Sequence, residues 1–320
     1  MKIFRLVFSL ILISALTVCA SAATLLVPGG ELIGMELHDN SVTVAAFDET
    51  LGQSAKAAGL KAGDRIVSIN GTAVTCPQDI RTALSCSDGK IDMVIRRGDK
   101  TKNLQLVPTA TANGPKLGVF LKQGTSGVGT VTYYDPADGS FAALGHGVND
   151  PTGSLLSLTE GSIFCAGVRE VKKGKVGTPG QLMGTLTDDR QIGQVDKNTA
   201  QGVFGTISFV PKTEPLPVAQ PHQVRTGKAT IRSTVAGQAL QEYSVEIVKI
   251  YPNAPERSRN LLLKVTDPQL LETTGGIVQG MSGSPIIQDG KLVGAVTHVL
   301  VNDPTTGYGI FIENMLDAAA

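Results

Sequence analysis

The sequence predicts a mainly β protein of two domains with a few helices. The chain has 320 residues, which is enough for two separate hydrophobic cores. It contains 37 Gly, 16 Pro and no Trp, and many short runs of Val, Ile, Leu and Thr stand between Gly, Asn and Asp, which is typical of strands joined by turns. Lys plus Arg and Asp plus Glu number 28 each, so a net charge of zero argues against nucleic acid as a partner.

Residues 1–23 have the pattern of a secretory signal peptide or an N-terminal membrane anchor. Lys2 and Arg5 precede an apolar run from Leu6 to Cys19, and the small residues Ala20-Ser21-Ala22 follow it. The run is shorter than the roughly 20 residues that an unaided membrane span needs. We therefore expect the rest of the chain to be exported, either released or anchored.

The remaining cysteines are predicted to be free thiols. Cys76 and Cys86 flank residues 77–85, where Pro at the start and one apolar stripe predict a helix. Ten helical residues would separate the two cysteines by roughly 15 Å, whereas a disulfide needs Cα atoms within about 7 Å. Cys165 has no evident partner, so we expect no intrachain disulfide.

Residues 27–109 contain an ordered series of short elements that we expect to form the first domain. In order they are a strand at 42–47, a short helix at 54–60, an alternating strand at 65–69, an Asn-Gly turn at 70–71, the helix at 77–85 and a strand at 91–97. This order places two helices against a small sheet. The small, breaker-rich residues 110–115 are the expected linker.

The segment A-x-x-A-G-L-K-A-G-D-R-I-V-S-I-N-G at residues 55–71 resembles the signature of PDZ domains. The resemblance implies a partly open β-barrel or sandwich with two helices that captures a peptide by adding it to a sheet edge. In that family a glycine-containing loop holds the peptide carboxylate, and the matching residues here are Leu32, Ile33 and Gly34. The chain's own termini are possible PDZ ligands.

Residues 116–320 are expected to form the second domain. Strand-like runs separated by turn residues recur to the end of the chain, which favours a barrel or a sandwich over βαβ units. The sequence contains no G-x-x-x-x-G-K-[ST], no H-E-x-x-H and no paired C-x-x-C. We therefore expect neither a cofactor nor a metal site.

Two short motifs in this second domain indicate a nucleophilic serine and its base. Ser282 lies in Gly-Met-Ser-Gly-Ser-Pro at 280–285, and His146 lies between two glycines in Ala-Leu-Gly-His-Gly at 143–147. A serine hydroxyl is a weak nucleophile unless a base, usually histidine, takes its proton. Either motif alone could be structural, but together they favour acyl transfer.

The segment 280–301 is similar to the nucleophile segment of chymotrypsin-like proteases, which fold as a double β-barrel. The resemblance implies that the backbone N–H groups of Gly280 and Ser282 stabilise the oxyanion. It also implies that the following strand, with Val296, Thr297 and His298, lines the pocket for the substrate side chain.

The order of signal segment, PDZ domain, A-L-G-H-G and G-M-S-G-S-P-I-I-Q-D-G-K-L-V-G-A-V-T-H resembles the sporulation stage IV B peptidases of endospore-forming bacteria. That family implies an exported serine endopeptidase of trypsin-like mechanism at the forespore membrane or the intermembrane space. It cleaves itself and then a membrane-bound regulator of an intramembrane protease. The consequence is activation of the late mother-cell sigma factor.

The same resemblance implies a triad of His146, Asp267 and Ser282. Asp267 stands in Thr-Asp-Pro, 15 positions before Ser282, where it could equally be a turn-forming residue. Other carboxylates that could serve as the acid are Asp150, Asp196 and Asp303.

Two other functions stay open from the sequence alone. The first is a catalytically inactive PDZ adaptor that senses peptides. The second is a general envelope protease, although such proteases usually carry the PDZ domain after the protease domain. In either case the partner is a protein or peptide.

Overall fold

The computed structural model describes residues 24–150, 153–254 and 257–320. The expected signal peptide or anchor at residues 1–23 lies outside this range. Within it strands dominate and the helices are short, so the prediction of a mainly β protein is confirmed. No helix in this described part is long and apolar enough to cross a membrane.

The C-terminal part of the chain forms a closed antiparallel barrel, which we call the second barrel. Its strands, in barrel order, are β15 (Gly227–Thr234), β16 (Leu240–Ile250), β17 (Leu261–Val265), β20 (Asp303–Phe311), β19 (Lys291–Leu300) and β18 (Pro285–Gln288). Alternate side chains point inward, as in β15, where Ala229 and Ile231 are buried and Lys228 is exposed. Helix α4 (Pro268–Thr274) precedes the loop that leads to β18, and α5 (Ile312–Ala319) ends the chain.

A first barrel is closed by the same kind of pairing. Its strands, in barrel order, are β9 (Val119–Tyr134), β10 (Ser140–Ala143), β13 (Gly202–Ile207), β12 (Gln181–Thr199), β11 (Leu158–Lys172) and β2 (Leu32–Phe47). Because β2 also pairs with β9, the ring closes on itself. Strand β1 (Leu25–Pro28) adds to β9 and also pairs with β14 (Leu216–Pro217), and the 3-10 helix η1 (Pro221–Gln223) follows β14.

The two barrels share a buried apolar cluster. Tyr133 and Phe204 of the first barrel pack with Leu292 and Ile310 of the second, and Met315 of α5 completes the cluster. All five side chains are less than 5% exposed. This contact fixes the two barrels against each other and so fixes any site that both contribute to.

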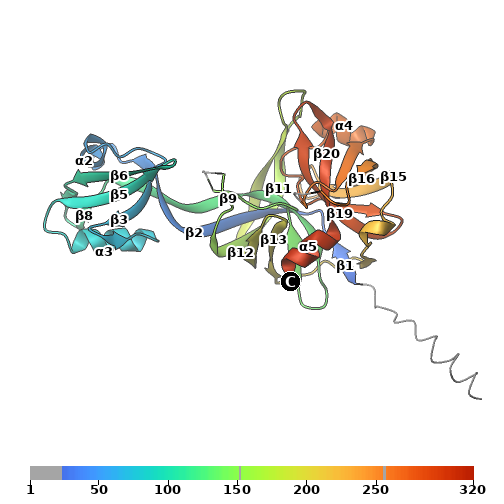
Figure 1. Cartoon of the computed structure of the whole chain (residues 1–320), viewed down its shortest axis with the longest axis horizontal. Helices are drawn as coiled ribbons and strands as arrows, with labels where there is room; N and C mark the ends of the chain where they lie inside the picture. Colours follow the sequence, from blue (N-terminus) through green and yellow to red (C-terminus); the bar gives the residue numbers. More distant parts are fainter. Residues whose placement is uncertain (1–23, 151–152, 255–256) are drawn as a thin grey trace, which may run out of the picture.

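The PDZ domain is inserted into the first barrel between β2 and β9 (Figure 1). Its elements are α2 (Gln53–Ala57), β3 (Arg65–Ile69), β4 (Thr72–Ala73), α3 (Pro77–Ser85), β5 (Ile91–Arg97), β6 (Lys100–Leu106), β7 (Thr109–Thr111) and β8 (Gly114–Lys116). They enclose a core of their own that contains Ile66, Ile80 and Ile95. The predicted helix at 77–85 is confirmed, and Cys76 and Cys86 at its ends are free thiols, as is Cys165.

The long strands β2 and β9 run from the barrel into the PDZ domain, and each has 16 residues. They pair from Leu32 to Leu37 in the barrel and again from Val42 to Phe47 in the PDZ domain, with a register shift between these two stretches. At the shift Gly124 has φ +72°, and a Cβ there would lie 1.9 Å from the Leu37 carbonyl oxygen. The close approach of the two strands at this register shift therefore requires glycine at position 124.

The structure differs from the expected boundaries of 27–109 for the PDZ domain, 110–115 for a linker and 116–320 for the peptidase domain. Val27, Ile33 and Leu37 pack in the core of the first barrel with Val131 and Ile163. The expected linker at 110–115 lies within the β7–β8 hairpin, where Ala110 pairs with Pro115 and Thr111 with Gly114. The sequence could not reveal this, because one alternating strand pattern continues through both parts of β2 and does not indicate which sheet each part joins.

Candidate active site

Ser282 lies in the loop between α4 and β18, and this loop is held against the first barrel. The Gly283 N–H donates to the Val296 carbonyl at 2.7 Å. Thr130 Oγ1 donates to the Gly280 carbonyl at 2.7 Å, and Thr132 Oγ1 donates to the Gly283 carbonyl at 2.8 Å. Two threonines of β9 therefore fix the carbonyls on either side of Ser282.

Gly283 permits the close approach of the two barrels at this loop. Its φ is +99°, and a Cβ there would lie 2.0 Å from the Thr130 carbonyl oxygen and 2.6 Å from the Leu144 nitrogen. Both neighbours are backbone atoms, which cannot move aside as a side chain can. The glycine after Ser282 is therefore a packing requirement as well as a turn residue.

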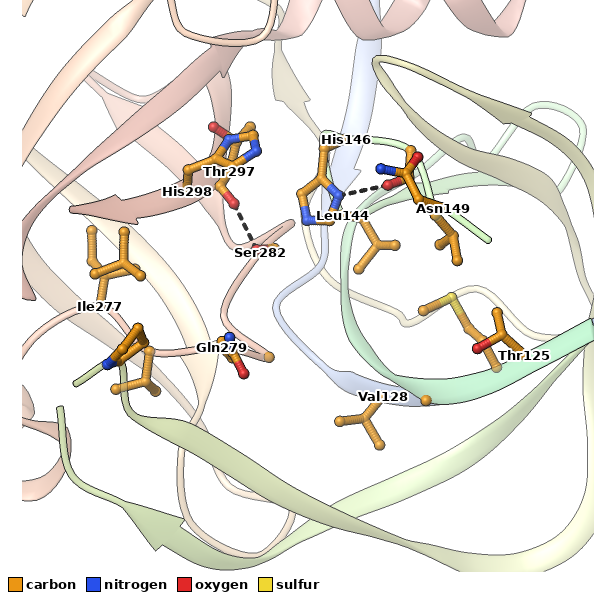
Figure 2. A pocket seen from close by; sticks show the side chains of 18 of the residues that line it. Thr125, Val128, Leu144, His146, Asn149, Ile277, Gln279, Ser282, Thr297 and His298 are labelled. Carbon is orange, nitrogen blue, oxygen red and sulfur yellow. Dashed lines mark hydrogen bonds between the residues drawn. The ribbon is translucent and has the colours of Figure 1, made fainter. Parts of the chain in front are cut away.

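His146 reaches the same place from the end of β10 through a sharp turn. Leu144 and Gly145 both have positive φ, 71° and 68°. A Cβ on Gly145 would lie 2.9 Å from Cγ2 of Thr297, which belongs to β19 of the second barrel. The turn thus directs the imidazole of His146 toward the loop that carries Ser282, and Figure 2 shows both side chains at one opening.

The hydrogen bond of His146 decides which ring nitrogen carries the proton. Nδ1 lies 3.0 Å from the Gly147 carbonyl oxygen, which can only accept, so Nδ1 is the donor and Nε2 is the acceptor. Burial lowers the pKa of His146 below its ordinary value of 6.5, and the Gly147 carbonyl partly opposes this by favouring the charged ring. Near pH 7 the ring is therefore neutral, with the tautomer that a general base needs.

The Ser282 hydroxyl donates to the Thr297 carbonyl at 2.7 Å. The hydroxyl has one proton, so in this structure it is not donated to His146. Thr297 in turn donates from Oγ1 to the Ser258 carbonyl at 3.0 Å, which holds this part of β19 in place. A rotation about the Ser282 Cα–Cβ bond is needed before His146 can take the proton.

The backbone before Ser282 leaves two N–H groups available. Among the hydrogen bonds of the described residues, neither the Gly280 N–H nor the Ser282 N–H has an intramolecular acceptor. Gly280 has φ +100°. The adjacent Gln279 is paired with the first barrel, donating to the Gly180 carbonyl at 2.9 Å and accepting from the Leu182 N–H at 2.8 Å. These contacts hold the loop in place and leave free the two N–H groups that the resemblance assigns to an oxyanion.

The structure does not bring Asp267 to this site. Asp267 is the N-cap of α4: one carboxylate oxygen accepts from the Leu270 N–H at 3.0 Å and the other from the Ser244 N–H at 3.2 Å. Asp before Pro at the first helical position is a capping pattern. This corrects the triad expected from the resemblance, because the carboxylate is engaged in backbone contacts and the Gly147 carbonyl lies at His146 Nδ1.

The other candidate acids also lie outside the cavity. The carboxylate of Asp150 accepts from the Ser154 N–H, Asp303 accepts from the hydroxyls of Thr305 and Thr306, and Asp196 is exposed on β12. Among the described residues, no Asp or Glu lines the cavity around His146 and Ser282.

Asn198 of β12 is a residue that the sequence did not single out. Its side-chain oxygen accepts from the Val148 N–H at 2.9 Å, and its nitrogen donates to the carbonyls of Val148 at 2.8 Å and Leu156 at 2.9 Å. It thus holds the segment that follows His146. A single Asn in a strand has no sequence pattern that would have indicated this role.

A cavity of about 540 Å³ surrounds Ser282. Thr297 and His298 line it, as expected, and the imidazoles of His146 and His298 are 5.3 Å apart between centroids. Val296 does not line it, because alternation along β19 turns this side chain into the barrel core, where it is fully buried. The apolar side chains that also line it are Met35, Leu37, Val128, Leu144, Ile277, Val278, Val299 and Val301.

The residues expected to bind a peptide in the PDZ domain lie elsewhere. Leu32 and Ile33 are buried in the barrels and Gly34 pairs with Val128 and Phe164. The sheet edge near the PDZ helix α3 is instead the first part of β9. In the described residues, β9 pairs there only with β2.

Several contacts place this part of β9 beside α3. Val119 and Leu121 pack in the same cluster as Ile80 and Leu84 of α3. The Gln123 side chain donates to the Thr75 carbonyl, just before the helix, at 3.2 Å. The unpaired edge of β9 and the helix therefore form the place where a peptide strand could add to the sheet.

Two family models match the chain. The model described as SpoIVB peptidase S55 matches residues 113–316, and a PDZ domain model matches residues 51–97. The first match contains both His146 and Ser282. It covers more than half of the chain.

The curated relatives match a smaller part of the chain, and the solved structures match it with low sequence identity. Putative zinc metalloproteases of Brucella suis biovar 1 and Brucella melitensis biotype 1 are 32% identical over 109 residues, which are 34% of this chain and 28% of theirs. This chain thus spans little more than a quarter of their length. In the described residues no group of His, Cys, Asp and Glu could hold a metal ion.

Among solved structures, the PDZ domain of the SdrC-like protein from Listeria monocytogenes is 23% identical, with a TM-score of 0.22 over 26% of this chain and 87% of that one. The active form of the Rv3671c protease from Mycobacterium tuberculosis is 14% identical, with a TM-score of 0.37 over 60% of this chain and 72% of that one.

Proposed function

Because the chain belongs to the SpoIVB peptidase S55 family and is a serine peptidase, we propose that it cleaves itself and then a membrane-bound regulator of an intramembrane protease. The outcome would be activation of the late mother-cell sigma factor during sporulation. The observation that supports the peptidase chemistry best is the convergence of Ser282 and His146 from two barrels at one cavity. The family match supports the sporulation role.

The proposed reaction is acyl transfer through Ser282. The hydroxyl turns from the Thr297 carbonyl to Nε2 of His146, which takes the proton as Ser282 Oγ attacks the peptide carbonyl. The N–H groups of Gly280 and Ser282 stabilise the oxyanion, and each such donor contributes about 3 to 4 kcal/mol. His146 then gives the proton to the leaving amine, and water releases the acyl group.

We propose that the Gly147 carbonyl orients His146 in place of a carboxylate. The carbonyl fixes the Nδ1–H tautomer and lies 3.0 Å from the nitrogen. It carries no full charge, so it stabilises the imidazolium in the transition state less than an aspartate would.

We propose that the chain acts after export, either at the forespore membrane or in the intermembrane space. The segment at residues 1–23 would provide export and either release or anchoring. The PDZ edge of β9 would receive a peptide from a partner. The chain's own termini remain a second proposed ligand of this edge, and in this structure Lys197 Nζ donates to the carbonyl oxygens of Ala319 at 2.6 Å and Ala320 at 2.7 Å.

The test is labelling of the purified full chain with a fluorophosphonate, followed by intact mass and peptide mapping. We expect one adduct on Ser282 and self-cleavage fragments in the wild type. Neither should occur in Ser282→Ala, whereas Ser68→Ala, a serine in the PDZ strand β3, should behave as the wild type. A folded wild type without an adduct would favour the inactive PDZ adaptor instead.

A further inference from the structure

A second cavity lies beside the second barrel and shares no lining residue with the cavity around Ser282. Its volume is about 420 Å³, and it lies between the turn that joins β18 to β19 and the segment that contains η1. We call it the basic cavity, because Arg225 of this segment and Lys291 of β19 line it. Asp289 is the one acidic residue among those that line it in the described part of the chain.

The walls of the basic cavity are held together by a buried amide side chain. Gln288 is 7% exposed, and its Oε1 accepts from the Arg225 N–H at 3.0 Å. Its Nε2 donates to the carbonyls of Arg225 at 2.9 Å and Lys228 at 3.1 Å. The backbone that carries Arg225 is therefore fixed against the hairpin that carries Lys291, so the cavity has its shape before a ligand binds.

Neither basic side chain has an ion-pair partner within the described residues. The ion pairs found there involve other arginines, and Asp289 takes part in none of them. Arg225 and Lys291 thus bring a guanidinium and an ammonium to one cavity from two different segments. These are the two side-chain groups that bind phosphate oxygens best.

The described part of the chain begins next to the basic cavity. The Thr24 carbonyl accepts from the Val218 N–H at 3.0 Å. Val218 also pairs with Leu292, and the next residue, Ala219, lines the cavity. The expected signal peptide or anchor at residues 1–23 therefore joins the fold beside the two basic residues. Figure 1 shows β1 at the end of the molecule that lies away from the PDZ domain.

We propose that the basic cavity binds the phosphate of an anionic lipid headgroup in the membrane that residues 1–23 reach. This contact holds the two barrels against the membrane and directs the PDZ domain away from it. An anionic lipid surface attracts basic residues beside a membrane segment, and each one raises the affinity by about fivefold. The inference goes beyond the proposed function and does not depend on Ser282.

The test measures how fast an N-hydroxysuccinimide ester acylates individual lysines of the full chain, with peptide mass spectrometry as the readout. The chain is reconstituted in vesicles of phosphatidylcholine, either alone or with about one third phosphatidylglycerol. We expect Lys291 to react at least about fivefold more slowly on the vesicles with phosphatidylglycerol. Lys100, exposed on β6 of the PDZ domain, should react equally fast on both. Equal rates for Lys291 on the two kinds of vesicle would overturn the inference.

Matched variants test whether the charges of the basic cavity are responsible. Arg225→Gln should abolish the difference at Lys291, whereas Arg96→Gln, the same change at an exposed position of β5, should preserve it. Asp289→Asn should enlarge the difference, because it removes the acid at a residue with φ +52°, a conformation that Asn adopts as well as Asp. A difference that persists in Arg225→Gln, or that disappears in Arg96→Gln, would contradict the assignment.

A free phosphate ion has the same chemistry as the headgroup, so the source is tested separately. Inorganic phosphate added to vesicles of phosphatidylcholine alone should leave the acylation of Lys291 unchanged. Slowing as large as that caused by phosphatidylglycerol would indicate a site for free phosphate and overturn the membrane assignment. Ser282→Ala should give the same rates as the wild type, so a failure of the proposed peptidase function would leave this inference intact.

Discussion

His146 reaches Ser282 through a turn in which Leu144 and Gly145 both have positive φ, 71° and 68°. Its partner at Nδ1 is the carbonyl of the next residue, at 3.0 Å. The base, its orienting group and the turn that presents them thus lie within four consecutive residues. At the scale of single residues, the proposed mechanism therefore assigns to a backbone carbonyl the orienting task that a carboxylate performs in many serine peptidases.

The lowered pKa of His146 predicts how activity depends on pH. A general base works in its neutral form, and burial keeps the ring neutral to a pH below its ordinary pKa of 6.5. The acidic limb of kcat/KM against pH should therefore have its midpoint below 6.5. The measurement is hydrolysis of one peptide substrate from pH 4.5 to 9, and a midpoint at 7 or above would contradict the assignment.

Gly283 predicts a large effect from one methyl group. In Gly283→Ala the Cβ would lie 2.0 Å from a backbone oxygen at a positive φ, so the loop must move and the fluorophosphonate adduct should be lost. Gly290→Ala is the matched control, since Gly290 also has positive φ, +72°, but its Cβ would meet nothing within 4 Å. Strain there should lower stability by about 1 to 2 kcal/mol and leave labelling intact. Equal labelling of both variants would refute this account of the loop.

At the scale of elements, the two residues proposed as nucleophile and base, Ser282 and His146, lie where the two barrels meet. Thr130 and Thr132 of β9 bind the loop that carries Ser282, and Gly180 and Leu182 pair with Gln279. Local motifs therefore identified His146 and Ser282 correctly as neighbours at one cavity. Partners that depend on which elements meet, such as Asn198, were not visible in the sequence.

Asp267 illustrates the same limit. The family resemblance implied a catalytic acid at this position, and the sequence equally allowed a turn-forming residue, whereas the structure shows a helix cap. The choice depends on where α4 lies relative to β10, which no local pattern determines. In β19 the resemblance implied that Val296 lines the cavity, but this side chain lies in the core. A strand pattern alone does not show which of its two faces points inward.

The cap predicts how two substitutions of Asp267 differ. Asn caps a helix about as well as Asp, so Asp267→Asn should unfold within a few tenths of a kcal/mol of the wild type, and Asp267→Ala should lose about 1 kcal/mol. Both should retain most of kcat/KM, because the carboxylate contacts Leu270 and Ser244 rather than His146. Denaturant unfolding and peptide hydrolysis provide the two measurements. A drop of kcat/KM by 1,000-fold or more in a fully folded Asp267→Asn would restore the triad.

At the scale of the whole molecule, the PDZ domain is an insertion in the hairpin that connects β2 and β9 of the first barrel (Figure 1). The motif at 55–71 predicted the PDZ fold, since its turns and helices are local. The place where the PDZ domain joins the barrel was not predictable, because β2 keeps one alternating pattern while its partners change. Strand β2, which continues into the PDZ domain, also contains Met35 and Leu37, and both of these residues line the cavity.

This insertion predicts the outcome of two deletions. Leu37 and Thr125 are paired neighbours on β2 and β9, so replacing residues 38–124 by Asn-Gly should close a two-residue hairpin. The shortened chain should fold and label at Ser282. Removing residues 1–115 instead takes away β1 and β2, opens the first barrel and should leave a chain that does not fold. Circular dichroism and fluorophosphonate labelling read out both, and folding of the second deletion alone would contradict the insertion.

The central claim is that His146 activates Ser282 without a carboxylate. It is tested most directly by the rate of fluorophosphonate labelling of Ser282 in the wild type, His146→Gln, Asp267→Asn and His222→Gln, the last being an exposed histidine in η1. The account predicts that His146→Gln slows labelling by about 1,000-fold or more, while the other two variants stay within about threefold of the wild type. Normal labelling of a folded His146→Gln, or its loss in Asp267→Asn, would contradict it.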